Sequence, residues 1–136
     1  VPGIAGLAAG IDFVRAQRTE RILLHERQLL RRAGEGMSRI PRVSCYLARD
    51  ENRQAGALSF TVSGMPPEQV AEQMARRGIA LRAGLHCAPF AHRTAGTLPD
   101  GTVRMSVSAF NRAFEIDAML FSLREVSALR GGDEIS

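Results

Sequence analysis

Cys87 is the residue of this chain whose type and surroundings are best suited to covalent chemistry. It lies in the run RAGLHCAP over residues 82–89, where arginine, glycine, histidine and proline surround the thiol. Nearby positive charge favours the thiolate, which is the nucleophilic form of cysteine. The competing interpretation is a buried structural cysteine, because free cysteines are often buried. The residues alone leave both interpretations open.

Three further residues near Cys87 are candidates for substrate binding. Arg104 follows in the run TVRMS over 102–106, where it alternates with apolar residues that are expected to face the core. An arginine in a cleft suits bidentate binding of a carboxylate, whereas an arginine on an open surface is solvated. Arg82 precedes the thiol in its own segment and has the same two interpretations. His86 either orients a substrate or packs.

The chain contains no lysine, and all 18 of its basic residues are arginine. A Schiff base between a lysine and a cofactor or substrate therefore cannot form within it. The three histidines and two cysteines lack the paired spacing of a metal site, so no metal is expected. Cys45 lies in an expected strand and Cys87 in an expected loop, which favours two free thiols in a reducing cytoplasm.

Length and composition restrict the class of protein. The 136 residues suit one domain with its own core. The net charge of +4 permits nucleic-acid binding, but the arginines are scattered and only 5% of residues are aromatic, so no nucleic-acid partner is expected. No apolar stretch approaches the roughly 20 residues that span a bilayer, so no membrane partner is expected. The chain begins with Val1 rather than Met, and we expect it to be part of a longer protein.

Hydrophobic periodicity predicts an α+β fold, a small antiparallel or mixed sheet covered by helices. The expected helices cover residues 4–16, 19–38, 67–77 and 113–129, and the expected strands cover 43–47, 58–63, 79–83 and 103–108. Thr19 is expected to cap the second helix, and Gly34 and Gly36, followed by Pro41, to end it. The connection between Cys87 and Arg104 is expected to be a short ordered loop.

Four segments of the chain resemble segments of one family, and they occur in the same order as in that family. The run over 82–89 resembles the catalytic-cysteine loop of pyridoxal-phosphate-dependent cysteine desulfurases, and its Arg-x-Gly-x-His-Cys-Ala pattern is similar to their selenocysteine-lyase-like branch. PGIAGLAAG over 2–10, GTVRMS over 101–106 and FNRAFEID over 110–117 are similar to other segments of these enzymes. The resemblance covers almost the whole chain.

The resemblance implies a place in a larger enzyme. The chain would be the C-terminal small domain of a fold-type I enzyme of the class V aminotransferase fold, and the large domain with its Schiff-base lysine would lie upstream. Residues 1–38 would link to that large domain, and 39–130 would form the α+β domain. Residues 131–136, at the end of the chain, are expected from their position to be a disordered tail. Alone, the chain is expected to bind no pyridoxal phosphate, to be inactive, and to expose apolar surface on residues 4–16.

The resemblance also implies a reaction for the complete enzyme. Pyridoxal phosphate would take up L-cysteine or selenocysteine, and Arg104 would bind the substrate carboxylate with Arg82 and His86 close by. The Cys87 thiolate would attack the substrate sulfur, so that a persulfide remains on Cys87 and alanine leaves. The enzyme would be a cytoplasmic homodimer that passes its sulfur to an acceptor protein.

Two positions depart from the family pattern. Arg112 replaces the threonine that opens a helix-capping box, so the cap of the last helix is expected at Asn111. Leu85 stands where some members carry a second histidine, which leaves the preference between cysteine and selenocysteine open. Two alternatives also remain. One is another class V aminotransferase or pyridoxal-phosphate lyase in which Cys87 is incidental, and the other is a non-enzymatic α+β module that binds a partner.

Overall fold

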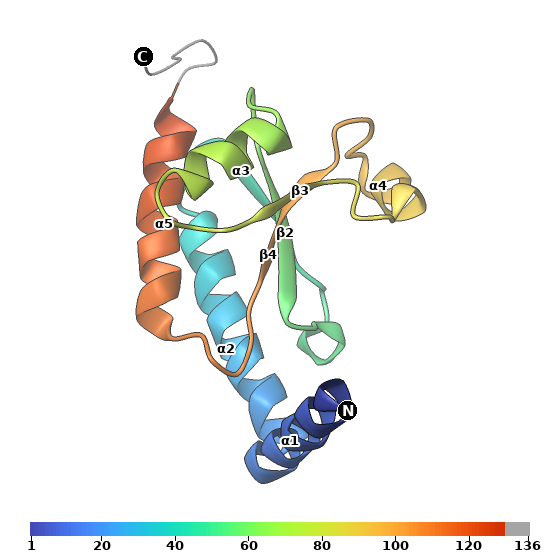
Figure 1. Ribbon diagram of the computed structural model, residues 1–136. Helices are drawn as coiled ribbons and strands as arrows, with labels where there is room; N and C mark the ends of the chain where they lie inside the picture. The colour runs from blue at the N-terminus through green and yellow to red at the C-terminus, as the bar shows by residue number, and fades with distance from the viewer. Residues whose placement is uncertain (130–136) are drawn as a thin grey trace.

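Helices and an antiparallel sheet make up residues 1–129, which the computed structural model of the protein describes (Figure 1). The expected tail over 131–136 lies outside the described residues. The helices are α1 (Pro2–Gln17), α2 (Thr19–Met37), α3 (Pro67–Ala75), α4 (Pro89–Ala95), α5 (Ala113–Ala128) and the short 3-10 helix η1 (Glu51–Arg53). The strands are β1 (Val43–Tyr46), β2 (Ala57–Val62), β3 (Arg82–Gly84) and β4 (Thr102–Ser106).

The sheet has the order β1-β2-β4-β3, and all its neighbouring strands are antiparallel. Helices α2, α3 and α5 lie on one side of it in Figure 1, whereas α4 lies at the other side. Strand β2 shows the alternation that this arrangement requires, because Leu58, Phe60 and Val62 are buried and the residues between them are half-buried. The predicted α+β class is confirmed. These three helices cover one face of the sheet, and they leave the other face free of their cover.

Glycines inside α2 let neighbouring elements approach closely. The sequence predicts this helix over 19–38, ended by Gly34 and Gly36 together with Pro41; the helix ends at Met37. A Cβ on Gly36 would collide with the side chain of Leu120 on α5, and a Cβ on Gly34 would collide with Leu47 after β1. The predicted range of the helix is therefore confirmed to within one residue, but the predicted role of the glycines is wrong, because they serve packing rather than termination. The spacing of Ile22, Leu23, Leu29, Leu30 and Met37 predicts an apolar stripe on this helix. The last three are buried, whereas Ile22 is half-buried and Leu23 is exposed.

Two predicted helix caps are also wrong. Helix α2 begins after Arg18, which has a φ of 67°, and the Thr19 hydroxyl donates to Glu20 rather than closing the helix end. Helix α5 begins after Arg112 and not after Asn111. The Glu115 carboxylate accepts a hydrogen bond from the backbone N–H of Arg112 at 2.7 Å. This is the hydrogen bond that the glutamate contributes to a capping box, and it forms without the threonine.

The segment that leads to Cys87 differs from its prediction in two ways. The strand expected over 79–83 covers only Arg82–Gly84, because Ile79 and Leu81 pack against the core instead of pairing with β4. The connection from Cys87 to β4 contains helix α4, which begins with a proline at its first turn. This helix was missed because its seven residues are too few to show a helical hydrophobic period.

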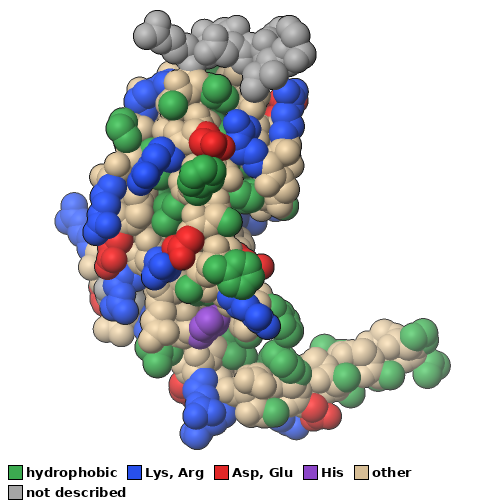
Figure 2. Space-filling view, turned by 90° about the vertical axis from the view of Figure 1, so that its left-hand side faces the viewer, with side chains coloured by type: hydrophobic (Ala, Val, Ile, Leu, Met, Phe, Trp, Pro, Cys, Tyr) green, Lys and Arg blue, Asp and Glu red, His purple; other side chains and the backbone are tan. Residues whose placement is uncertain are grey.

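Helix α1 is an arm that extends from the rest of the chain (Figures 1 and 2). None of its residues is buried, and Ile4 and Leu7 are 76% and 65% exposed. Near its C-terminal end, the ring of Phe13 stacks on Phe110 before α5, with 5.1 Å between ring centroids. No helix among the described residues has the length and apolar character needed to cross a membrane.

Candidate active site

The Cys87 loop is a strained turn between β3 and α4. His86 and Cys87 have φ values of 52° and 61°, in the left-handed region that residues with a Cβ seldom occupy. A backbone hydrogen bond from Ala88 to Leu85 closes the turn at 2.9 Å. Cys87 is exposed and forms no disulfide, and Cys45 is a half-buried free thiol. Strain of this kind persists only where the surroundings hold it, and it gathers at functional sites.

A row of four side chains crosses the sheet beside this loop. Tyr46 on β1 pairs with Ser59 on β2, Ser59 pairs with Arg104 on β4, and Arg104 pairs with Arg82 on β3. Cross-strand partners project from the same face of a sheet, so the row runs from one edge strand to the other. It lies on the face opposite Phe60 and Val103, which are buried in the core. The order of the strands thus gathers polar groups on the uncovered face.

A pocket of about 330 Å³ lies over part of this row. Its floor is formed by Tyr46, Ser59, Thr102 and Arg104 from three strands. Its walls come from the cysteine loop, from α4 and from the segment just beyond that helix, namely His86, Ala88, Ala91, His92, Ala95 and Thr97. The alanines make much of the wall apolar, while the floor carries a cation. This volume lies at the lower end of the range of small-molecule sites, which is about 300–1,000 Å³.

Three buried polar atoms at this pocket have no hydrogen-bond partner among the described residues. They are Nδ1 of His86, Oγ1 of Thr102 and Nε of Arg104. Buried polar groups are satisfied in the great majority of cases, so each exception needs an explanation. All three belong to residues that line one pocket, and the arrangement therefore indicates a binding site for a polar ligand.

His86 is held in a defined orientation. Its Nε2 lies 3.1 Å from the backbone carbonyl of Thr102. Partial burial lowers the pKa of His86; the hydrogen bond to Thr102 opposes this change, and Arg104, Arg82 and His92 reinforce it electrostatically. The lowered pKa favours the neutral imidazole.

His92 fixes the helix that forms one wall. It is buried, and its Nδ1 lies 2.7 Å from the Thr97 hydroxyl. The backbone N–H of Thr97 also donates to the carbonyl of His92 at 2.9 Å. The ring of His92 stands 6.0 Å from that of His86. These contacts join the end of α4 to the segment that leads into β4.

The structure brings most of the predicted site residues together. Arg104 and His86 line the pocket, and Arg82 is the cross-strand neighbour of Arg104. Cys87 lies between two lining residues in sequence but does not itself line the pocket. Thr102 was missed, although its position two residues before Arg104 places it on the same strand face. Tyr46 and Ser59 carried no comparable local signal, because their place depends on pairing between distant strands.

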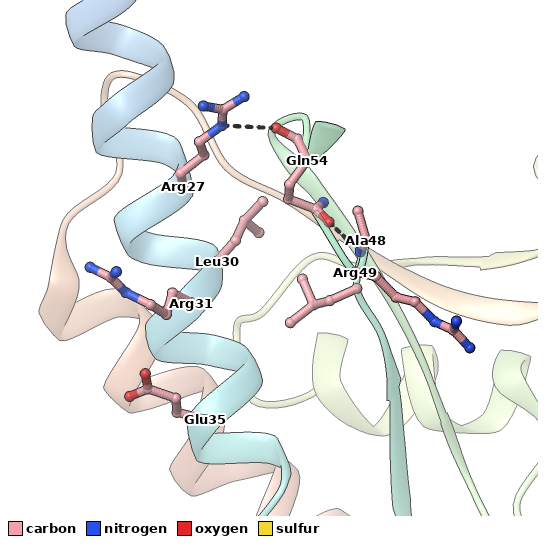
Figure 3. Close-up of a pocket in the computed structure, with 8 residues that line it drawn as sticks. Arg27, Leu30, Arg31, Glu35, Ala48, Arg49 and Gln54 are labelled. Atoms are coloured by element: carbon pink, nitrogen blue, oxygen red, sulfur yellow. Dashed lines mark hydrogen bonds between the residues drawn. The ribbon is translucent and has the colours of Figure 1, made fainter. Parts of the chain in front are cut away.

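A second hollow, of about 220 Å³, lies between α2 and the β1–β2 connection (Figure 3). The guanidinium of Arg27 there donates hydrogen bonds to the backbone carbonyls of Gln54 and Asn52. Figure 3 shows Arg31 and Arg49 pointing away from each other on opposite sides of the hollow, so no polar groups converge. Within residues 1–129, no group of three or more potential metal ligands is gathered, here or elsewhere. The pocket beside the Cys87 loop is therefore the better candidate.

Comparison with solved structures identifies the class of fold. The described chain matches an apo cysteine desulfurase of Thermococcus onnurineus with a TM-score of 0.83 and 34% identity, over 90% of this chain and 30% of that one. It matches a cysteine desulfurase of Escherichia coli with a TM-score of 0.80 and 24% identity, over 90% and 29% of the two chains, which supports the fold alone. The fold is therefore one found within enzymes that have about three times its length.

The family follows from the sequence comparison. The aminotransferase class-V model matches residues 1–119, so the chain belongs to the aminotransferase class-V family. A probable cysteine desulfurase of Pyrococcus abyssi is 34% identical over 132 residues, which are 96% of this chain and 32% of that protein. Another from Mycolicibacterium paratuberculosis is 35% identical over 122 residues, 90% of this chain and 17% of that protein. The chain spans a third or less of the length of these relatives.

Proposed function

We propose that this chain is the C-terminal small domain of a cysteine desulfurase of the selenocysteine-lyase-like branch. The observation that carries the proposal is the pocket beside the Cys87 loop, with three buried unpartnered polar atoms and two adjacent arginines. The names of relatives at 34% identity support the same activity. Residues 1–38 would link to a large domain, and residues 39–130 would form the catalytic-cysteine domain.

Pyridoxal phosphate fits this proposal only in part, because the chain has no lysine to hold it covalently. The lysine would come from the rest of the longer protein, and the chain alone would bind none of the cofactor as a Schiff base. When bound, pyridoxal phosphate supplies an electron sink for cleavage of the carbon–sulfur bond. The residues of this chain would supply position, charge and the nucleophile.

The proposed roles follow the geometry of the pocket. Arg104 would bind the substrate carboxylate through charge-assisted hydrogen bonds, with Arg82 adding positive charge from the neighbouring strand. His86 would orient the substrate. Cys87 Sγ would attack the sulfur of L-cysteine, so that a sulfur–sulfur bond forms as the carbon–sulfur bond breaks and the persulfide stays on Cys87. Alanine would then leave, and an acceptor protein would take the sulfur.

An exposed thiol suits such transfer, because an acceptor can reach it. We further propose a cytoplasmic homodimer in which the apolar arm α1 is covered by the rest of the enzyme, since Ile4 and Leu7 are largely exposed here.

A second candidate is another class V aminotransferase or pyridoxal-phosphate lyase in which Cys87 has no catalytic part. The position of Cys87 outside the pocket lining favours it. The third possibility, a non-enzymatic module, is weakened by the family match over residues 1–119.

The deciding experiment compares two cysteine variants of the longer protein loaded with pyridoxal phosphate. Cys87→Ala should abolish sulfide release from L-cysteine and the persulfide detected by mass spectrometry, while Cys45→Ala should keep both. Unchanged turnover in Cys87→Ala would establish the second candidate instead.

A further inference from the structure

Two successive residues of the Cys87 turn have a backbone conformation that they do not prefer. His86 and Cys87 have φ values of 52° and 61°, and the left-handed region is unfavourable for residues with a Cβ. One backbone hydrogen bond, from Ala88 to the carbonyl of Leu85, closes the turn at 2.9 Å. The Cys87 side chain is exposed, so packing of the thiol does not hold it in place. The turn therefore needs support from the elements on either side of it.

Helix α4, which follows the turn, has little support of its own. It has seven residues, and helices shorter than about 12 residues are marginal without tertiary contacts. Six of the seven residues are exposed, and the one buried residue is His92. Because no apolar side chain of α4 is buried, the contacts of a histidine hold this helix against the rest of the domain.

The contacts of His92 run in two directions. Toward the turn, its backbone N–H donates to the carbonyl of Ala88, the residue after Cys87, at 3.2 Å. Toward β4, its Nδ1 lies 2.7 Å from the Thr97 hydroxyl, and this hydrogen bond forms with either tautomer because a hydroxyl both donates and accepts. The carbonyl of Thr97 accepts a hydrogen bond from the N–H of Gly101 at 2.8 Å. His92 thus joins the residue after Cys87 to the start of β4.

The path of contacts returns to the turn from its other side. The carbonyl of Thr102, the first residue of β4, lies 3.1 Å from Nε2 of His86, the residue before Cys87. The contacts therefore form a closed circuit in which each step is a covalent connection within the chain or a hydrogen bond. The side-chain links of this circuit are His86 to Thr102 and His92 to Thr97. Loss of either link opens the circuit and lets the strained turn relax.

We propose that His92 is a positioning residue for the reaction: through its hydrogen bond to Thr97, it holds Cys87 in the left-handed conformation that places Sγ beside the pocket. This inference rests on the proposed function, in which Cys87 Sγ is the nucleophile. The role differs from those of Arg104 and His86, which are proposed to contact the substrate. The ring of His92 lines the pocket, but its Nδ1 is occupied by Thr97.

The first test measures opening of the turn in the 136-residue chain. Hydrogen exchange of the Ala88 amide reports this opening, because its hydrogen bond to Leu85 closes the turn. Thr97→Val keeps the side-chain shape and the backbone hydrogen bonds but removes the hydroxyl. It should accelerate the exchange about fivefold, as loss of one hydrogen bond predicts. Thr97→Ser restores the hydroxyl and should restore the slower exchange.

The control removes another hydroxyl from the same helix. The Thr94 hydroxyl donates to the carbonyl of Phe90 at 3.0 Å, so this contact stays within α4 and lies outside the circuit. Thr94→Val should therefore leave exchange of the Ala88 amide unchanged.

Two amide side chains separate the two ring nitrogens of His92. The amide of Asn reaches the position of Nδ1, whereas the longer Gln places its amide at the position of Nε2. His92→Asn can keep the hydrogen bond to Thr97 and should leave exchange of the Ala88 amide nearly unchanged. His92→Gln should accelerate it as Thr97→Val does. Both variants bury the same polar group, so the comparison isolates the contact with Thr97.

The second test uses the longer protein loaded with pyridoxal phosphate. Support of Cys87 acts on the step in which Sγ attacks, so Thr97→Val and His92→Gln should lower kcat and kcat/KM for sulfide release from L-cysteine equally. We expect a fall of about tenfold, within the hundredfold that misplacement of a reacting group by about 1 Å can cost. Thr97→Ser and His92→Asn should retain most of the activity, a rescue that general loss of stability would not produce.

Four results would each overturn the proposal. They are unchanged exchange of the Ala88 amide in Thr97→Val, equal effects of Thr97→Val and Thr97→Ser, equal effects of His92→Asn and His92→Gln, and an unchanged kcat in Thr97→Val. If the longer protein releases no sulfide from L-cysteine, the proposed function fails instead. The exchange measurements need neither cofactor nor activity, and they then still decide whether His92 holds the turn, so the two failures are distinguishable.

Discussion

Arg82 and Arg104 face each other directly across β3 and β4. Like charges at paired positions of a sheet repel, and neither guanidinium forms an ion pair within the described part of the chain. The pair is therefore an unfavourable feature of the chain by itself, and an anionic ligand would relieve it. This relationship links the stability of the sheet to the chemistry of the pocket.

The first prediction follows from that repulsion. Arg82→Gln should stabilise the chain by a few tenths of a kcal/mol, up to about 0.5, at low ionic strength, and the gain should shrink in salt. Urea unfolding at two salt concentrations measures it. Arg76→Gln is the control, because it removes the pair that Arg76 makes with Glu72 at 2.8 Å and should change stability with the opposite sign. Destabilisation by Arg82→Gln would contradict the prediction.

Thiol accessibility gives a second prediction. Cys87 is exposed, whereas Cys45 is half-buried and burial raises its pKa. The native chain should therefore react with a chromogenic disulfide reagent in two phases, of which Cys87 gives the faster. Cys87→Ser should remove the fast phase and Cys45→Ser the slow one. A fast phase that remains in Cys87→Ser would show that the loop is not presented as described.

A third prediction concerns the glycine that supports the Cys87 loop. Gly101 has a φ of 81°, and a Cβ there would collide with the backbone of Gly84 at the end of β3. Gly101→Ala should cost more than about 2 kcal/mol and shift the NMR signals of residues 84–88. Gly78→Ala is the matched control, since its φ is 78° and its Cβ would meet open space, and it should cost about 1 kcal/mol. Equal costs would contradict the close approach.

The lowered pKa of His86, caused first by burial, gives a fourth prediction. In the unfolded chain a histidine has a pKa of about 6.5. At pH values between the pKa of His86 in the folded state and its pKa in the unfolded state, the unfolded state therefore binds more protons. The contribution of His86 to stability therefore increases as pH rises through this interval and is lost under acidic conditions. His86→Asn should flatten the dependence of unfolding free energy on pH between mildly acidic and neutral conditions. An unchanged slope would contradict it.

A fifth prediction concerns the attachment of helix α1. Phe110→Ala removes the stacked partner of Phe13, an interaction that contributes about 0.5–1.5 kcal/mol beyond burial. Amide hydrogen exchange in α1 should accelerate, while exchange in β2 should not change, because the core is untouched. Phe121→Ala removes another exposed ring, 67% accessible on α5, and should leave α1 unaffected. Acceleration throughout the sheet in Phe110→Ala would refute this local effect.

Local patterns in the sequence were sufficient for much of the fold. Alternation in Leu58, Phe60 and Val62 predicts the strand over 58–63, and burial of these three side chains confirms it. The helix predicted over 67–77 is observed as α3, Pro67–Ala75. These predictions succeed because a strand or helix repeats its environment within a few residues. The absence of lysine and the composition of the Cys87 loop likewise needed no structure.

Only the tertiary structure decided how the site is assembled. The placement of β4 between β2 and β3 puts Tyr46, Ser59, Arg104 and Arg82 in one row, and no local pattern specifies pairing between such distant strands. Tertiary packing also gives Gly36, expected only to help end α2, a role as a point of close contact with α5. The sequence by itself determined that a thiol, two arginines and a histidine lie in neighbouring segments. The fold determined that Arg104 and His86 line one pocket, with Arg82 beside Arg104 on the neighbouring strand, while the thiol stands exposed beside the pocket. Side-chain direction depends on register and backbone conformation, which is why the sequence alone did not decide this.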